Sequence, residues 1–427
     1  MATRKIKKKV EFIAIGSELL TSHFLETNSL YLAGKLEELG LQLSYKTVVG
    51  DRLSELQEAL EVARARSWLI IMSGGLGPTE DDRTKEALSR VLHRRLVFRK
   101  DLLEKIKKRF ESRGLKMPLS NRKQALVIEG AEILENPNGT APGLWVEAEE
   151  QIFILLPGPP RELKPMVENL VLPKLKNFSQ KRLLQAVLRV TGCGESWVED
   201  HLKPVYSELP KNLELITLAS PGEVQVRLRL LTEEKRLVQD LRVLNRLKNK
   251  ILTVLGNRVF SQEDEPLEKV IGSKLAQMKK TLACAESCSG GLLASRITDV
   301  PGSSSYFLES VVTYSNESKI RLLGVQEGLI NEKGAVSAEV AEAMARGVRE
   351  RAGADFGLST TGIAGPGGGS EAKPVGLVYT GLAFPGGVLV EKNFFLGNRE
   401  QIKFLTTQKA LDMLRLKLVE LEKKTKR

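Results

Sequence analysis

The first part of the chain alternates short apolar runs with longer amphipathic segments. Apolar runs predict buried strands, and apolar residues three or four positions apart predict helices packed on those strands. The strands are expected at 10–16, 41–51, 67–75 and 150–160, and the helices at 27–40, 52–66 and 82–92. This order predicts an α/β fold whose parallel sheet has helices on both faces. Because ligands bind at the carboxyl ends of such strands, the loops "GGLGPTEDD" and "LPGPPRE" are expected at the binding edge.

The pattern changes after about residue 173. Residues 183–202 predict a strand, a glycine turn and a short helix, and residues 213–231 predict a hairpin with Pro-Gly at its tip. A long helix at 234–256 completes a small α+β unit, and "SQEDEPLEK" (261–269) is interpreted as a junction. Helix and strand then alternate again to the end, which predicts a third α/β unit. The predicted domains are therefore 1–172, 173–260 and 264–427.

Composition narrows the class of protein. A chain of 427 residues with 42% hydrophobic and 28% charged residues is typical of a globular protein with two or three domains. No apolar run is long enough to span a membrane, and Glu11 breaks the apolar stretch that follows the basic start, which argues against a signal peptide. Three cysteines at unrelated spacings form neither a disulfide framework nor a zinc site. We expect a cytoplasmic protein.

The net charge of +12 indicates nucleic-acid binding only if it is spread over a folded surface. Residues 1–10 contribute +5 and residues 423–427 contribute +4, which leaves +3 for the rest of the chain. The basic residues therefore gather in two tails rather than on one face of the folded body. The sequence argues against a DNA-binding face.

The loop "SGGLGPTEDDRTKEAL" is the first candidate site. Its glycine amides can approach a phosphate closely, and a helix N-terminus favours an anion. Two adjacent carboxylates, Asp81 and Asp82, beside the Thr79 hydroxyl are what a phosphate-bound magnesium ion requires. Acidic residues in a first helical turn can also act only as helix caps, and spacing does not separate these two readings.

The stretch "LACAESCSGGLLASRIT" (282–298) is the second candidate site. A nucleophile on a strand-to-helix turn projects from the sheet, where helix amides can stabilise an oxyanion. Cys288 needs a base or a positive field to become a thiolate and is interpreted as a small buried residue. Ser289, before Gly-Gly, is interpreted as a helix cap. Ser287 remains as a nucleophile, although a turn hydroxyl is the alternative.

The chain has no histidine after His201, so a base for this turn must be another residue. Lys319 is a candidate near the start of a helix predicted from about Asn316. A lysine with its ordinary pKa of about 10.4 is protonated, but burial lowers that pKa, as in Ser-Lys hydrolases. A further cluster follows at Thr360 and Thr361, where a glycine loop that carries Lys373 could hold a phosphate.

Five segments of the first 170 or so residues resemble the molybdopterin-binding-type domain of the CinA (competence/damage-inducible) family. They are "GSELLTS…ETN", "GGLGPTEDDRTKEAL", "RGLKMPLSNRKQA", "ENPNGTAPG" and "LPGPPREL". The resemblance implies a three-layer (MoaB/MogA-type) domain that hydrolyses ADP-ribose with a divalent metal, Mg or Co. It places the nucleotide pocket around Gly75, Gly77, Thr79, Asp81, Asp82 and Glu162, with Asp81 and Asp82 as the metal ligands. The middle unit resembles a KH-type domain, but its "GCGES" turn is not a nucleic-acid-clamping GXXG loop, so a spacer or dimer-forming role is expected.

Four ordered motifs between about 265 and 420 resemble the CinA C-terminal domain, which also occurs alone as nicotinamide mononucleotide (NMN) deamidase. They are "AESCSGG", "SVVTYSNESK", "TGIAGPGGGSEAKPVG" and "GNRE". The resemblance implies an amidohydrolase that needs no cofactor, with Ser287 as nucleophile and Lys319 as base. It also implies a substrate pocket at Tyr314, Thr361, Gly365 and Arg399, and a homodimer.

The expected reaction converts NMN to nicotinic acid mononucleotide and ammonia. Amides at the helix start near Gly290 are expected to stabilise the oxyanion, and Arg399 with the glycine loop is expected to hold the 5′-phosphate. Two other classes of protein remain open at this point: a non-catalytic nucleotide- or molybdopterin-binding protein, and a competence-related DNA-associated protein whose binding would weaken with salt.

Overall fold

The computed structural model describes residues 9–179 and 181–425. Most of the basic tail residues that enter the charge argument, at 1–8 and 426–427, lie outside the described residues. The chain divides into two compact units, one comprising the chain up to Leu184 with Leu231–Val238, the other Gln185–Leu230 with the chain from Gln239 on. Among the described residues, no helix combines the length and apolar character that a membrane span requires.

The first unit is built on a six-stranded sheet with the order β2-β1-β3-β8-β7-β6. The strands are β1 (Val10–Ile15), β2 (Leu43–Val49), β3 (Leu69–Ser73), β6 (Glu132–Leu134), β7 (Gly143–Ala148) and β8 (Gln151–Leu156). Strands β2, β1, β3 and β8 are parallel, as predicted. The prediction of a parallel sheet does not hold for β7 and β6, which pair antiparallel. A tight turn at Glu149, whose φ is 56°, joins β7 directly to β8 and leaves no room for a crossover helix.

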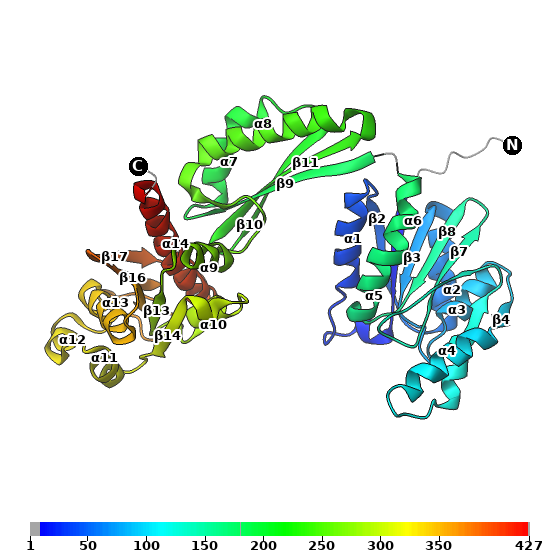
Figure 1. Cartoon of the computed structure of the whole chain (residues 1–427), viewed down its shortest axis with the longest axis horizontal. Coiled ribbons are helices and arrows are strands. Elements are labelled where there is room, and N and C mark those ends of the chain that lie inside the picture. The colour runs from blue at the N-terminus through cyan, green and yellow to red at the C-terminus, as the bar shows by residue number, and fades with distance from the viewer. Residues whose placement is uncertain (1–8, 180, 426–427) are drawn as a thin grey trace. The chain divides into compact units, whose positions relative to one another are not determined.

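Helices cover both faces of this sheet, which gives the expected three layers (Figure 1). The helices are α1 (Asn28–Glu38), α2 (Leu53–Arg66), α3 (Thr84–Val91), α4 (Lys100–Glu111), α5 (Pro160–Met166) and α6 (Leu172–Leu175). Alternate residues of β1 point to opposite faces: Phe12 packs in the core under α1 and α5, and Ile13 packs in the core under α2, α3 and α4. Strands β4 (Leu96–Phe98) and β5 (Leu126–Ile128) form a separate two-stranded pair.

The middle segment forms a four-stranded sheet with the order β10-β11-β9-β12. Its elements are β9 (Lys181–Thr191), α7 (Glu195–Tyr206), β10 (Leu213–Ser220), β11 (Glu223–Glu233), α8 (Leu237–Leu255) and β12 (Val259–Ser261). The predicted hairpin is confirmed, with β10 and β11 paired antiparallel around Pro221 and Gly222. Buried residues alternate along β11, so one face of the sheet carries the core of this segment.

The C-terminal segment contains a five-stranded sheet with the order β14-β13-β15-β16-β17. Its strands are β13 (Leu282–Glu286), β14 (Phe307–Val312), β15 (Phe356–Gly362), β16 (Leu377–Phe384) and β17 (Gly387–Phe394). One face packs on α9 (Leu267–Met278), α10 (Leu292–Thr298) and α14 (Arg399–Thr425), and the other on α11 (Asn316–Leu323), α12 (Glu327–Lys333) and α13 (Ala338–Ala352) (Figure 1). Strands β14, β13 and β15 are parallel, so their carboxyl ends meet at one edge.

Candidate functional site

Ser287 lies at the first position after β13, in the bend that leads to α10. Its amide donates to the carbonyl of Thr360 in the neighbouring strand at 2.9 Å, which holds the residue at the sheet edge. Gly290 and Gly291 follow with φ of 60° and 93°, a backbone that side chains with a Cβ rarely adopt. The Gly-Gly pair therefore allows the strand-to-helix turn that presents Ser287.

Lys319 reaches Ser287 from the neighbouring helix. Helix α11 begins after Ser315, whose Oγ accepts the amide of Ser318 at 3.1 Å, so that Lys319 falls in its first turns. The Lys319 side chain is 1% exposed, and its Nζ lies 3.2 Å from the Oγ of Ser287, 32 residues earlier in the chain. Nζ also donates to the carbonyl of Thr313 at 2.8 Å, which fixes the direction of the side chain. The structure thus brings the two predicted catalytic residues into contact.

Burial shifts the pKa values of Lys319 and Cys288 in opposite directions. It lowers the pKa of Lys319, because removal from water disfavours the ammonium form. It raises the pKa of the Cys288 thiol to about 12, so the thiolate is scarce at neutral pH. Cys288 packs against Ala364, Val378 and Ile402 as the buried residue that the sequence predicts. Ser287 is therefore the hydroxyl of this turn that contacts a buried lysine, whereas Cys288 stays protonated and packed.

Glu286, which the sequence analysis overlooked, organises the turn. Its side chain is fully buried, and Oε2 accepts hydrogen bonds from the amides of Gly291 and Leu293 and from the Ser289 hydroxyl at 2.8–3.0 Å. Oε1 accepts the amide of Ala294 at 2.9 Å. The carboxylate therefore caps α10 through its first free amides. The prediction that Ser289 caps this helix is wrong, because Ser289 donates to Glu286 instead.

The amides near Gly290, which were expected to stabilise an oxyanion, already have acceptors within the turn. The amide of Gly290 donates to the carbonyl of Ser287 at 3.2 Å, and the amide of Gly291 is taken by Glu286. Within the described ranges, the amides of Cys288 and Ser289 donate to no other residue. An amide directly after the nucleophile is the usual donor on such a turn. An oxyanion would therefore be bound before Gly290 rather than at the helix start.

Glu286→Ala is expected to lower the free energy of unfolding by at least about 2 kcal/mol, because it removes a helix cap and leaves buried amides without an acceptor. Urea unfolding measures the change. The matched control is Glu309→Ala on β14, which removes a partly exposed ion pair with Arg351 and should cost no more than about 1 kcal/mol. Equal stability of the wild type and Glu286→Ala would contradict the capping role.

The residues expected to bind substrate lie in two groups. Arg399, at the start of α14, donates to the Tyr314 hydroxyl at 3.1 Å and to the carbonyl of Gly365 at 2.7 Å. Since Lys319 also donates to the carbonyl of Tyr314, this group adjoins the Ser-Lys pair. Thr361 is buried and donates to the carbonyl of Ala335 at 2.7 Å, so its hydroxyl hydrogen already has an acceptor. Its contact with substrate stays a prediction.

The glycine loop after β15 is held by Lys373 rather than left mobile. Lys373 donates to the carbonyls of Lys333 and Val336 at 2.7 and 2.8 Å, which ties the loop to the end of α12 and the segment that follows. This ammonium is therefore engaged in positioning the loop. A phosphate bound at this loop would therefore contact backbone amides of the loop, because the Lys373 ammonium already donates to two carbonyls.

A pocket of about 420 Å³ lies at the carboxyl ends of β1, β3 and β8 in the first unit. It is lined by all six residues that the resemblance assigned to a nucleotide pocket, together with Glu18 and Asp51. These six are Gly75, Gly77, Thr79, Asp81, Asp82 and Glu162. The loops after β3 and β8 meet here as the strand order predicts, because both strands are parallel neighbours.

Asp81 and Asp82 do not cap α3. The residue before this helix is Arg83, whose side chain makes no cap hydrogen bond, and neither Asp81 nor Asp82 accepts an amide of α3 among the described residues. Asp82 instead accepts the amide of Thr79 at 2.8 Å and the Thr79 hydroxyl through the same oxygen, Oδ2. The capping alternative is therefore not realised, and the second oxygen of Asp82 stays available to a ligand.

Asp81 and Asp82 do not form a complete metal site by themselves. They could bind a metal ion that is also coordinated by substrate phosphates. Within residues 9–179 and 181–425 no group of three or more His, Cys, Asp or Glu side chains is arranged to hold a metal. Mg²⁺ commonly binds through one or two carboxylates and completes its shell with water and substrate phosphates. Asp81 and Asp82 suit that arrangement.

The loop 136–140 borders this pocket through Thr140, and its Asn136 holds Glu162, a role that no sequence pattern indicated. Asn136 donates to Glu162 at 2.7 Å and accepts the amide of Gly139 at 2.8 Å. A Cβ on Gly139 would lie 1.9 Å from Glu162, so only glycine allows Glu162 to approach the loop. The "ENPNGTAPG" motif thus positions the Glu162 carboxylate in the pocket.

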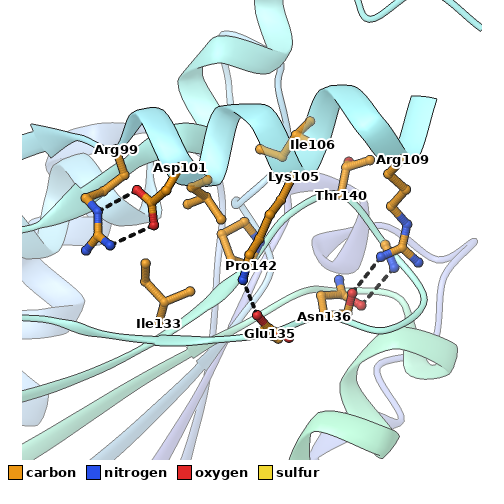
Figure 2. A pocket seen from close by; sticks show the side chains of 12 residues that line it. Arg99, Asp101, Lys105, Ile106, Arg109, Ile133, Glu135, Asn136, Thr140 and Pro142 are labelled. Carbon is orange, nitrogen blue, oxygen red and sulfur yellow. Dashed lines mark hydrogen bonds and ion pairs between the residues drawn. The ribbon is translucent and has the colours of Figure 1, made fainter. Parts of the chain in front are cut away.

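A further hollow, of about 430 Å³, lies on the other side of this loop, along α4. Figure 2 shows Lys105 directed to Glu135, Arg99 to Asp101, and Arg109 to the backbone of the loop. Each cation in this hollow already has a partner. The hollow is therefore not arranged as an anion site. Arg109 instead holds loop 136–140, which borders the pocket lined by Asp81, Asp82 and Glu162 (the carboxylate pocket).

Three successive parts of the chain match known domain families. Residues 11–177 match a probable molybdopterin binding domain, 185–261 the damage-inducible protein CinA KH domain, and 264–418 the CinA C-terminal domain. A putative competence-damage inducible protein of Moorella thermoacetica is 46% identical over 95% of this chain and 98% of its own length. One of Caldicellulosiruptor bescii is 44% identical over 96% and 99%.

Among solved structures, the competence/damage inducible protein CihA of Agrobacterium tumefaciens is 40% identical, with a TM-score of 0.35. The match covers 36% of this chain and 93% of that one. The full-length relatives and the three domain matches establish the relationship. The chain belongs to the CinA family, with a molybdopterin-binding-like domain, a KH domain and a CinA C-terminal domain.

Proposed function

We propose that the C-terminal segment is a serine amidohydrolase that converts NMN to nicotinic acid mononucleotide and ammonia. The observation that carries this proposal is the buried contact of 3.2 Å between Lys319 Nζ and Ser287 Oγ. Burial lowers the pKa of Lys319, as a general base requires. The substrate follows from the resemblance of four ordered motifs to the stand-alone deamidase.

In the proposed reaction, neutral Lys319 takes the proton of Ser287, and Oγ attacks the carboxamide carbon. Amides directly after Ser287 stabilise the oxyanion. The C–N bond then breaks, and Lys319 returns the proton to the departing ammonia. Lys319 next takes a proton from water, whose oxygen attacks the acyl carbon. The ester bond to Ser287 then breaks, Lys319 returns the proton to Oγ, and the acid is released. No step requires a metal.

The test is incubation of the full chain with NMN, followed by measurement of both ammonia and nicotinic acid mononucleotide. The two products should form in equal amounts, with and without a chelator. Binding of NMN without turnover would instead support the non-catalytic alternative. Equal turnover of unrelated amides would contradict the assignment of the substrate.

A second proposal concerns the carboxylate pocket of the first unit, which we infer to hydrolyse ADP-ribose at its pyrophosphate with a divalent metal. Glycine amides and carboxylates lining one pocket support this proposal, because they match a diphosphate and its metal. Asp81 and Asp82 would hold the metal, which would neutralise the phosphate charge. The assay is release of AMP and ribose 5-phosphate with Mg²⁺ or Co²⁺. Equal rates in excess chelator would refute the role of the metal.

Gly77→Ala is expected to lower metal-dependent turnover or metal affinity by about 10- to 100-fold with little loss of stability. A Cβ at this position would lie 2.5 Å from Oδ2 of Asp82 and would displace that carboxylate. Calorimetric titration with Co²⁺ and thermal unfolding measure the two effects. The matched control is Gly34→Ala in α1, where an added Cβ would have no neighbour within 4 Å. Wild-type metal affinity in Gly77→Ala would argue against Asp82 as a ligand.

A further inference from the structure

A third hollow, of about 730 Å³, lies beside the turn that carries Ser287. Its walls come from the first two turns of α14, the start of α10 and the tip of the β10–β11 hairpin. Leu292, Phe404 and Pro221 make it partly apolar, and Arg399 and Lys403 bring positive charge to it. Arg399 therefore belongs both to this hollow and to the group around Tyr314.

Lys403 is the unusual member of this set. It lies one helical turn after Arg399, so the two cations share one face of α14. Its side chain is only partly exposed, and within residues 9–179 and 181–425 its ammonium makes no hydrogen bond or ion pair. Its Nζ would lie 3.7 Å from a Cβ on Gly290, in the turn that presents Ser287. A half-buried ammonium without a partner beside a reactive turn indicates an anionic ligand.

The acidic residues of the hollow do not neutralise this ammonium. Glu223 pairs with Arg189 at 3.3 Å, and Glu400 is exposed on the helix surface. The hairpin wall is itself anchored: Thr191 donates to the carbonyl of Gly222 at 2.9 Å and accepts from Gln408 of α14 at 3.3 Å. The middle segment thus completes a preformed site rather than acting only as a spacer.

We propose that this hollow binds the 5′-phosphate end of a nucleotide whose base lies at Ser287, with Lys403 and Arg399 as its two cations. This inference rests on the proposed deamidation for the identity of the base but not for the phosphate site. Arg399 already donates two hydrogen bonds within the protein, so Lys403 carries the free charge. Two cations on one helix face suit a dianionic phosphate better than a neutral nucleoside.

The test compares NMN with nicotinamide riboside, which has the same carboxamide and lacks the phosphate. In Lys403→Gln, the KM for NMN should rise about 10- to 100-fold and kcat should change less than about threefold, because a charged hydrogen bond is lost from both ground and transition states. The kcat/KM for the riboside should not change. Lys409→Gln, which removes a lysine of α14 paired with Glu391, is the control and should keep wild-type constants for both substrates.

Equal losses for NMN and the riboside in Lys403→Gln would overturn the phosphate role, since they would indicate a general disturbance of the turn. Calorimetric titration of both proteins with NMN and with inorganic phosphate provides a readout without turnover. Identical affinities in the wild type and Lys403→Gln would also overturn the assignment. Weaker phosphate binding by the variant, without ammonia release by the wild type, would refute the deamidation and leave the phosphate site standing.

Discussion

Ser287→Ala is expected to lower the release of ammonia from NMN by about 10³-fold or more. The substitution removes the oxygen that lies 3.2 Å from Lys319 Nζ and leaves only uncatalysed attack by water in a site that still binds substrate. The KM for NMN should change little, because Ser287 is not among the residues expected to hold the nucleotide. A coupled assay for ammonia measures both constants.

Cys288→Ala is the matched control for this substitution, since it changes the adjacent residue of the same turn. The Cys288 thiol is buried among apolar side chains, and its pKa of about 12 keeps it protonated. The variant should therefore keep kcat within a few-fold of the wild type, with a stability loss typical of a small core truncation. Activity that survived in Ser287→Ala and disappeared in Cys288→Ala would refute the serine mechanism.

Lys319→Arg is expected to reduce kcat by about 10²- to 10⁴-fold, the range that general base catalysis contributes. Arginine can donate to the carbonyl of Thr313, as Lys319 does at 2.8 Å. It cannot accept the serine proton, because its guanidinium stays protonated at any pH the protein tolerates. Lys373→Arg, at another lysine that donates to backbone carbonyls, is the control and should keep most activity.

The same base predicts the pH dependence of the wild type. Lys319 acts only when neutral, so kcat/KM should rise about tenfold per pH unit below the pKa of Lys319 and level off above it. Burial lowers that pKa, which moves the plateau below the ordinary lysine range. A rate profile from pH 6 to 10 measures the midpoint. A midpoint at the pKa of a free lysine, or a rate that fell as pH rose through this range, would contradict the role of Lys319.

The two candidate sites share one structural cause. Each sits where parallel strands end, with β3 and β8 in the first unit and β13, β14 and β15 in the C-terminal segment. Residues far apart in the chain meet there because neighbouring parallel strands end at the same edge. Ser287 follows β13 and Lys319 follows β14 by one short loop and one turn of helix, so adjacent strands suffice to join them.

Local sequence was enough to predict most helices, the parallel strands and the loops that carry the chemistry. Periodicity and turn residues act over a few positions, and these signals survive in a single sequence. The hairpin tip at Pro221 and Gly222 and the start of α11 near Asn316 lie where such signals place them. Strands β6 and β7 were missed, because a run of three residues such as Glu132–Leu134 gives no periodic signal, and their antiparallel direction is set by pairing with neighbouring strands.

The roles of individual polar side chains depended on contacts between distant segments. Glu286 reads in the sequence as the last residue of a strand, yet its burial against α10 makes it the helix cap and displaces Ser289 from that role. In the sequence, Lys403 is one of many lysines in predicted helices. Only the structure places it between the turn at Gly290 and the tip of the β10–β11 hairpin. The resemblance named Ser287 and Lys319 as a pair, but strand pairing and burial created the short contact and the lowered pKa of Lys319. Desolvation arises only when distant segments pack together.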